Sequence, residues 1–322
     1  MGARSSQSRG PGLNKTDGHL IEYYRQAFGA GGGGTQPDIA PNNIIATGGS
    51  KTTYEDSGTE YTVHTFDGSG TFAVTSAGPG NTIDYLVIGG GGGGGAWVGG
   101  GGGAGGVITN HPDYPSARRS SSIPVTTGYS SPIVIGGGGT GWHQSGEGAG
   151  NVSETGTPGT DTTALSLRAA GGGMGGDWAI DQRDDGGSGG GGGYPTALTG
   201  GSGNQYSPEH PGPAPNQGYP GGSGSGTPYL STGGGGGAGG AGQNFSTSNS
   251  GDGGIGVQIK ITGPSTWTPT TQDPLGRTAT VGDQNPGPGE YQWYAGGGGG
   301  GHHNAAPSTY GTGGVGGGGD GR

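Results

Sequence analysis

The sequence contains no cysteine, and its 12 Lys and Arg residues are outnumbered by 22 Asp and Glu residues. Without cysteine, neither a disulfide nor a thiolate metal site can form, so redox chemistry does not indicate a compartment. The formal net charge of −10 at pH 7 argues against nucleic acid and anionic membranes as partners, because both attract basic surfaces. No apolar segment approaches the roughly 20 residues that a transmembrane helix needs.

Hydrophobic residues are also scarce, at 25% of the chain, so we expect no conventional hydrophobic core. Glycine is abundant instead. The 93 glycines and 22 prolines together make up about 36% of the chain, a level that usually signals low complexity or disorder. These glycines, however, form runs beside strand-like segments and are not diluted with serine. This arrangement favours an ordered fold over disorder.

Four strand-like segments lead directly into glycine runs. In the first, residues 82–88 (TIDYLVI) are mostly β-branched, aromatic or aliphatic, and seven glycines follow at 89–95. The same junction recurs after residues 131–135, 164–170 and 290–295. The runs that lack a clear preceding strand are expected to be return segments, and they occupy residues 99–103, 189–193, 233–237 and 316–319.

Polyglycine can form an extended helix with three residues per turn, a rise of about 3.1 Å per residue and no internal hydrogen bonds. Because no Cβ intervenes, several such helices can approach closely and satisfy their main-chain donors and acceptors sideways. We therefore expect a mainly β fold with a polyglycine-II helix bundle or sandwich. A Cβ inside it, as in Gly92→Val, should force the helices apart and cause aggregation.

The sequence predicts three parts: an arm, helix and linker in 1–45, a β plus polyglycine-rich domain in 46–263, and a partial glycine-rich repeat in 264–322. Within the second part, Asp67-Gly68 lies between the strand-like segments 60–66 and 71–75. Such a dipeptide between alternating segments predicts a β-hairpin.

A short helix is predicted in the first part, with Asp17 as N-cap and Gly29 at its end. A helix of this length is marginal alone in water, so its apolar face should dock on its own body or on a partner protein. The apolar residues at helical spacing are Leu20, Ile21, Tyr24 and Phe28.

No combination of residues predicts catalysis. Matches to G-x-G-x-x-G arise from composition and lack a βαβ context. His302 and His303 are adjacent, so on an extended segment their side chains point apart. We expect a protein that is not an enzyme and that holds no cofactor and no metal.

The spacers between the glycine runs are expected to form loops at the ends of the bundle, where binding residues tend to lie on a rigid scaffold. Aromatic rings beside hydrogen-bonding groups suit the recognition of sugars or protein loops. Alternatively, Trp97, Trp142 and Trp178 cap the bundle or fill a subunit interface. The candidate binding residues are Tyr114, Trp142, His143, Trp178, Asp184, Tyr206, His210, Tyr219, Tyr229 and His302.

Three segments, 65–74 (TFDGSGTFAV), 84–89 with its glycine run, and 253–259 (GGIGVQI), resemble the glycine-rich domain of many bacteriophage and marine cyanophage structural proteins. Residues 12–29 also resemble the starts of such proteins. The alternation of glycine runs and variable loops is similar to the tail-fibre adhesins of T-even-type phages. Members of that family hold a polyglycine sandwich and bind host receptors through tip loops.

These resemblances imply a virion structural protein of the tail-fibre or adhesin type, located on the particle surface. The N-terminal helix would attach the chain to other virion proteins, and the chain would form a homo-oligomer. Its loops would contact a host-surface glycan or an outer-membrane protein, with no role for nucleic acid. The alternative is a purely structural role as a capsid decoration, head fibre or fibril subunit.

Overall fold

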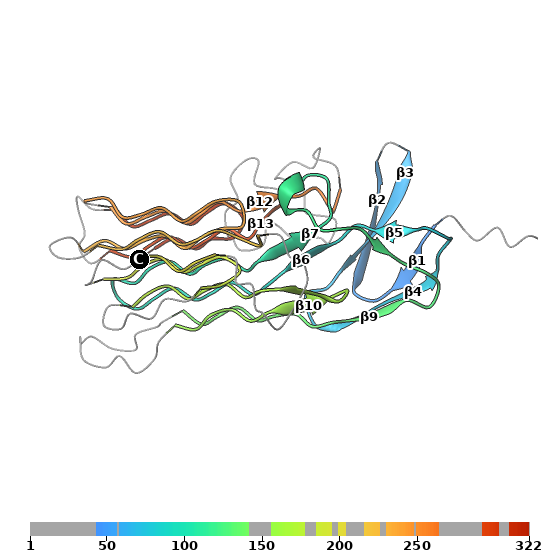
Figure 1. Cartoon of the computed structure of the whole chain (residues 1–322), viewed down its shortest axis with the longest axis horizontal. Helices are drawn as coiled ribbons and strands as arrows, with labels where there is room; N and C mark the ends of the chain where they lie inside the picture. The colour runs from blue at the N-terminus through green and yellow to red at the C-terminus, as the bar shows by residue number, and fades with distance from the viewer. Residues whose placement is uncertain are drawn as a thin grey trace, which may run out of the picture.

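The computed structural model describes residues 43–56, 58–141, 156–177, 185–194, 199–203, 216–225, 230–247, 249–263, 292–302 and 309–321. In these residues the protein is mainly β, as expected. Short strands gather at one end, and glycine-rich segments extend from them side by side (Figure 1). The predicted N-terminal helix with Leu20, Ile21, Tyr24 and Phe28 lies outside the described residues.

The strands are β1 (Ile45–Thr47), β2 (Ser50–Asp56), β3 (Thr59–Thr65), β4 (Gly70–Ser76), β5 (Thr82–Ile83), β6 (Leu86–Ile88), β7 (Val107–Thr109), β8 (Ile123–Pro124), β9 (Ser130–Ile133), β10 (Thr162–Ala164), β11 (Leu167–Ala169), β12 (Val257–Gln258) and β13 (Trp293–Tyr294). One 3₁₀ turn, η1, spans Ser116–Arg118. The strands form small antiparallel sheets in the orders β1-β4-β9, β2-β3, β5-β8, β6-β7, β10-β11 and β12-β13.

The hairpin predicted at Asp67-Gly68 is wrong. Although β4 follows β3 in the chain, β4 pairs with β1 and β9, and β3 pairs with β2 in a register that ends at Asp56↔Thr59. This earlier turn is shorter, and its Gly58 has a φ of +80°, which glycine adopts at no steric cost. β3 therefore pairs with β2, which precedes it, and not with β4, which follows it.

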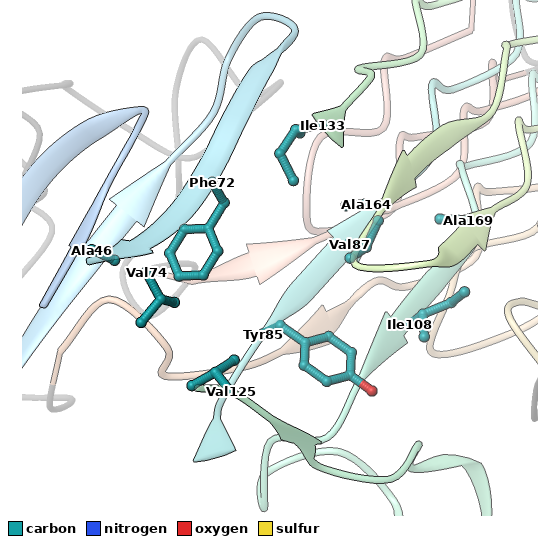
Figure 2. Packing of buried hydrophobic residues seen from close by; sticks show 10 residues of the cluster. All are labelled: Ala46, Phe72, Val74, Tyr85, Val87, Ile108, Val125, Ile133, Ala164 and Ala169. Carbon is teal, nitrogen blue, oxygen red and sulfur yellow. The ribbon is translucent and has the colours of Figure 1, made fainter. Parts of the chain in front are cut away.

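An apolar core lies among the strands, so the expectation of no conventional hydrophobic core is wrong for this end of the molecule. Alternation along β4 buries Phe72 and Val74 on one face. Scarcity of hydrophobic residues excludes a large core, but those present are concentrated enough for a small one. Its buried members, drawn in Figure 2, are Ala46, Phe72, Val74, Tyr85, Val87, Ile108, Val125, Ile133, Ala164 and Ala169.

The four predicted strand-to-glycine junctions are confirmed. β6, β9, β11 and β13 each deliver the chain, within at most two residues, into a glycine run. In addition, the run 99–106 returns the chain to β7. We call the described glycine-rich segments outside the strands, from residue 89 to residue 321, the glycine array.

Neighbouring segments of the array bond through their main chains with a period of three. Gly89, Gly92 and Gly95 donate to Gly106, Gly103 and Gly100 at N–O distances of 3.0, 2.8 and 3.0 Å. The residues that follow the first two, Gly90 and Gly93, donate instead to the segment 156–161, at Thr160 and Thr157 (2.9 and 3.0 Å). Every third residue of a segment thus faces the same neighbour.

The segment 99–106 lies at the centre of the array. Its bonds reach five other segments, namely 89–95, 170–176, 188–191, 233–236 and 298–301. For example, Gly103 donates to Gly173 O (2.8 Å) and Gly298 donates to Gly102 O (2.9 Å). A Cβ on Gly101 would overlap the carbonyl oxygen of Gly298. Close main-chain approach therefore excludes side chains here, and segments distant in sequence become direct neighbours.

Candidate functional site at the far end of the glycine array

The array has one end at the strands and another that we call the far end. The segments 89–95 and 99–106 run antiparallel from β6 and back to β7, so the turn 96–98 that joins them lies at the far end (Figure 1). Trp97 in this turn has a φ of +55°, a conformation that non-glycine residues rarely adopt. A tight reversal at this point is thus held by its surroundings.

Asp177 supports that turn. Its side chain is 4% exposed, and its Oδ1 accepts a hydrogen bond from the Ala96 main-chain N–H at 2.6 Å. Burial raises the pKa of the Asp177 carboxyl above its ordinary value, and the Ala96 bond partly offsets that rise. The carboxylate therefore caps the turn while being poorly solvated.

This environment predicts a pH effect for Asp177→Asn. An acid whose pKa is raised on folding binds its proton more tightly in the folded state, so stability falls as pH rises through that pKa. The amide of the variant would keep an acceptor for Ala96 without ionising. The variant should gain stability over wild type between acidic and neutral pH, as measured by melting temperature across a pH series. Asp177→Ala, which leaves the Ala96 N–H unpaired, should instead be less stable at every pH.

Hydroxyl groups bind the far ends of several segments together. Thr232 Oγ1 lies 2.9 Å from Gly99 O and 2.8 Å from Gly301 O. Ser250 Oγ donates to the same Gly301 carbonyl at 2.6 Å. Both side chains are buried. At the ends of these segments, Thr or Ser thus takes the place of glycine, and its hydroxyl supplies an additional hydrogen-bond donor to a main-chain carbonyl.

Ser225 and Ser231 close a neighbouring pair of segments. Ser225 Oγ donates to Ser231 O (2.6 Å) and accepts from the Ser231 N–H (3.0 Å). Ser231 also forms an antiparallel bridge with His302, which is one of the predicted binding residues and is buried. The structure therefore places His302 at the far end, within the bonded ends of the segments.

The two array segments that flank residues 142–155 are bonded to each other. The Thr157 N–H donates to Thr140 O (3.0 Å), and the Thr140 N–H donates to Thr157 Oγ1 (2.8 Å). Residues 142–155, which lie outside the described residues, are thus joined to the array at adjacent points. Of the predicted binding residues, those outside the described part of the chain are Trp142, His143, Trp178, Asp184, Tyr206, His210 and Tyr229.

Tyr114 and Tyr219, also predicted binding residues, both contact Arg118. The guanidinium of Arg118 lies over both rings, with its Cζ 5.2 Å from the Tyr114 centroid and 4.7 Å from the Tyr219 centroid. Arg118 Nε and Nη1 donate to Asn216 O and Ala238 O, both at 2.8 Å. Tyr114 is 1% exposed, and burial raises its pKa. In this structure the Tyr114 ring contacts the protein itself.

Sequence reasoning did not single out Asp177, Thr232 or Arg118. Asp177 is the first residue after a glycine run, and Thr232 is the last residue before another. Their positions at the ends of glycine runs were the sequence signal that could have identified them. Arg118 follows Tyr114 at a spacing of four residues, but its contact with Tyr219 depends on the tertiary fold.

Two features are absent from the part of the chain that the structure describes. No helix there has the length and apolarity of a membrane span. In the same ranges, no group of three or more His, Cys, Asp or Glu side chains is placed as metal ligands would be.

A family model described as a glycine-rich domain matches residues 65–322. The match covers the whole glycine array and begins at the last residue of β3. No curated protein and no solved structure matches the chain.

Proposed function

The chain belongs to the glycine-rich domain family, and we propose that it is a bacteriophage virion structural protein of the tail-fibre or adhesin type. In this role it lies on the particle surface and presents loops for attachment to the host. The three-residue period of the bonds between array segments supports a polyglycine-II bundle, because that helix turns once in three residues.

One observation carries this proposal: the array offers fixed, adjacent attachment points for loops at its far end. Thr140 and Thr157, which flank residues 142–155, are bonded to each other, and so are Ser225 and Ser231, which flank residues 226–230. A scaffold stabilised by main-chain bonds does not depend on the loop sequences, so the loops can vary with the receptor. This division between a rigid body and variable loops is common in recognition proteins.

The proposed partners are other virion proteins, further copies of the chain and a component of the host surface. Residues near Leu20, Ile21, Tyr24 and Phe28 attach the chain to other virion proteins, and the chain acts as a homo-oligomer. The aromatic and polar loop residues contact a host-surface glycan or an outer-membrane protein. The net charge of −10 disfavours nucleic acid as a partner. No catalytic step and no cofactor is part of the proposal.

A purely structural role, as a capsid decoration, head fibre or fibril subunit, is favoured by a different observation. The described residues at the far end, such as Asp177, Thr232 and Ser250, use their polar atoms within the chain. Gold labelling of phage particles with an antibody against the chain separates the two roles. Label on the tail supports the adhesin, label on the head or along a filament supports the structural role, and particles without label contradict both.

Replacement of residues 142–155 by a Gly-Ser linker of equal length should abolish adsorption of the phage to its host while particles still assemble. The replacement stops at residue 155 because residues 156–161 bond within the array and β10 begins at Thr162. The measurement is the adsorption rate of purified particles.

The matched control replaces an equally long stretch within residues 264–291, whose flanks Gly263 and Gln292 are bonded to each other (2.8 Å) at the strand end. This control should adsorb normally. Normal adsorption by the 142–155 variant would contradict the proposed attachment role of that loop.

A further inference from the structure

The hairpin of β2 and β3 stands apart from the rest of the molecule. These strands form a sheet of their own and pair only with each other among the described strands, and Figure 1 shows them projecting from the strand end. Tyr54 and Tyr61 stack across the hairpin on one of its faces. An isolated two-stranded hairpin is at best marginally stable in water, so a long projecting hairpin indicates that a partner covers it.

The pairing register identifies the main-chain groups that remain free. In an antiparallel pair, residues that exchange both main-chain bonds alternate with residues whose N–H and C=O groups point outward. The two-residue turn makes Asp56↔Thr59 a bonded pair. On β2, the outward-pointing main-chain groups therefore belong to Lys51, Thr53 and Glu55.

The outer edge of β2 is more accessible than that of β3. Lys51, Thr53 and Glu55 are all exposed. On β3, the last three residues are half-buried, and His64 is occupied by the body of the protein. Its Nδ1 lies 2.7 Å from Gly48 O, and its ring meets Phe72 edge-on at 5.4 Å. The β2 edge is thus the one that can accept another strand along its length.

The β2 edge is complementary to itself. If two copies of β2 pair antiparallel with Thr53 opposite Thr53, Lys51 of each copy lies opposite Glu55 of the other. Opposite charges and Thr–Thr pairs stabilise directly opposed positions. Within the described residues, Lys51 and Glu55 form no ion pair. Lys51 Nζ donates to Ala46 O (2.6 Å), and an ammonium group has further donors for a carboxylate.

We propose that the partner of the hairpin is a second copy of this chain, joined through antiparallel β2–β2 pairing centred on Thr53. The two hairpins then form one four-stranded sheet with a two-fold axis at its centre, which is the symmetry of most protein dimers. This inference rests on the hairpin alone and holds for either role proposed above.

Charge reversal tests the register. Sedimentation velocity on the full chain should show a dimer for wild type. Lys51→Glu places two glutamates opposite each other at both symmetric positions, and Glu55→Lys does the same with lysines. Each single variant should dimerise about tenfold more weakly or worse, and the double variant Lys51→Glu/Glu55→Lys should recover wild-type dimerisation. Association unaffected by the single variants, or not recovered in the double variant, would overturn the register.

A main-chain test complements the charge test. Proline at position 53 removes the outward N–H at the centre of the pairing, whereas proline is tolerated on strand edges. Thr53→Pro should prevent dimerisation, and Thr62→Pro, at the outward-facing position on β3, should leave it intact. A wild-type chain that stays monomeric at every concentration overturns the proposal. Slow exchange of the outward-pointing β2 amides in such a monomer would show that another segment of the same chain covers the β2 edge.

Discussion

Gly92→Ala is expected to lower the melting temperature by about 6 °C. A Cβ at this position would overlap the carbonyl oxygen of Gly173 and lie 2.6 Å from its carbon. Both atoms belong to main chain, which cannot rotate away as a flexible side chain can. The Gly92→Val change considered from the sequence adds two methyl groups to the same overlap.

The cost comes from the bonds around that contact. The Gly92 N–H donates to Gly103 O, the Gly103 N–H to Gly173 O and the Gly172 N–H to Gly90 O, each at 2.8 Å. Moving the segments apart lengthens all three bonds together. At about 1 kcal/mol per bond, with the lost packing added, the free energy of unfolding should fall by about 4 kcal/mol, which is large for one substitution.

The preceding glycine provides a matched control. A Cβ on Gly91 would have Gly103 O as its nearest neighbour, at 3.9 Å. Gly91→Ala should therefore melt at the wild-type temperature or slightly above it, because alanine restricts the unfolded chain more than glycine does. Differential scanning calorimetry of the two variants gives the comparison. Equal melting temperatures for Gly91→Ala and Gly92→Ala would show that the array is not held by close main-chain contact.

The difference between Gly91 and Gly92 also shows which features of the array can be predicted from the sequence and which cannot. A strand rich in β-branched and aromatic residues followed by glycines is a local signal, and it correctly predicted the junctions after β6, β9, β11 and β13. The neighbours of each segment could not be predicted, because one glycine run looks like any other. The central place of 99–106 arises from main-chain bonds, and these leave no pattern in side chains.

Local sequence signals also gave a wrong prediction where a different pair of strands formed the hairpin. Asp67-Gly68 fits a hairpin turn, but β2 reaches β3 through a shorter loop. Composition likewise hid the small core, because 25% hydrophobic residues is an average over a chain whose apolar residues concentrate near the strands. Tyr114 matched the type of residue expected in a binding loop, yet it is buried in a cluster with Val107, Val257 and Ile259, and Arg118 lies over its ring. The sequence does not specify that tertiary contact.

The hydrophobic core should support the array as well as the strands, and Phe72→Ala tests this dependence. Phe72 is 8% exposed and belongs to the buried cluster drawn in Figure 2. Truncating such a phenylalanine leaves a cavity and costs about 3–5 kcal/mol. Tyr310→Ala, at an aromatic residue that is 46% exposed, should change stability little.

The Phe72→Ala prediction also specifies which parts of the chain lose protection against amide exchange. Phe72 lies on β4, which pairs with β9, and β9 continues into the array; Val87 of the same cluster lies on β6, which leads into Gly89. Glycine loses more conformational entropy on ordering than any other residue, so segments without fixed starting points should not remain ordered. In Phe72→Ala, amide exchange should therefore accelerate in 99–106 as much as in β4, within a single thermal transition. If the array amides stayed protected while β4 exchanged, the array would be stable without the core, because its main-chain bonds alone would then outweigh the entropy of ordering glycine.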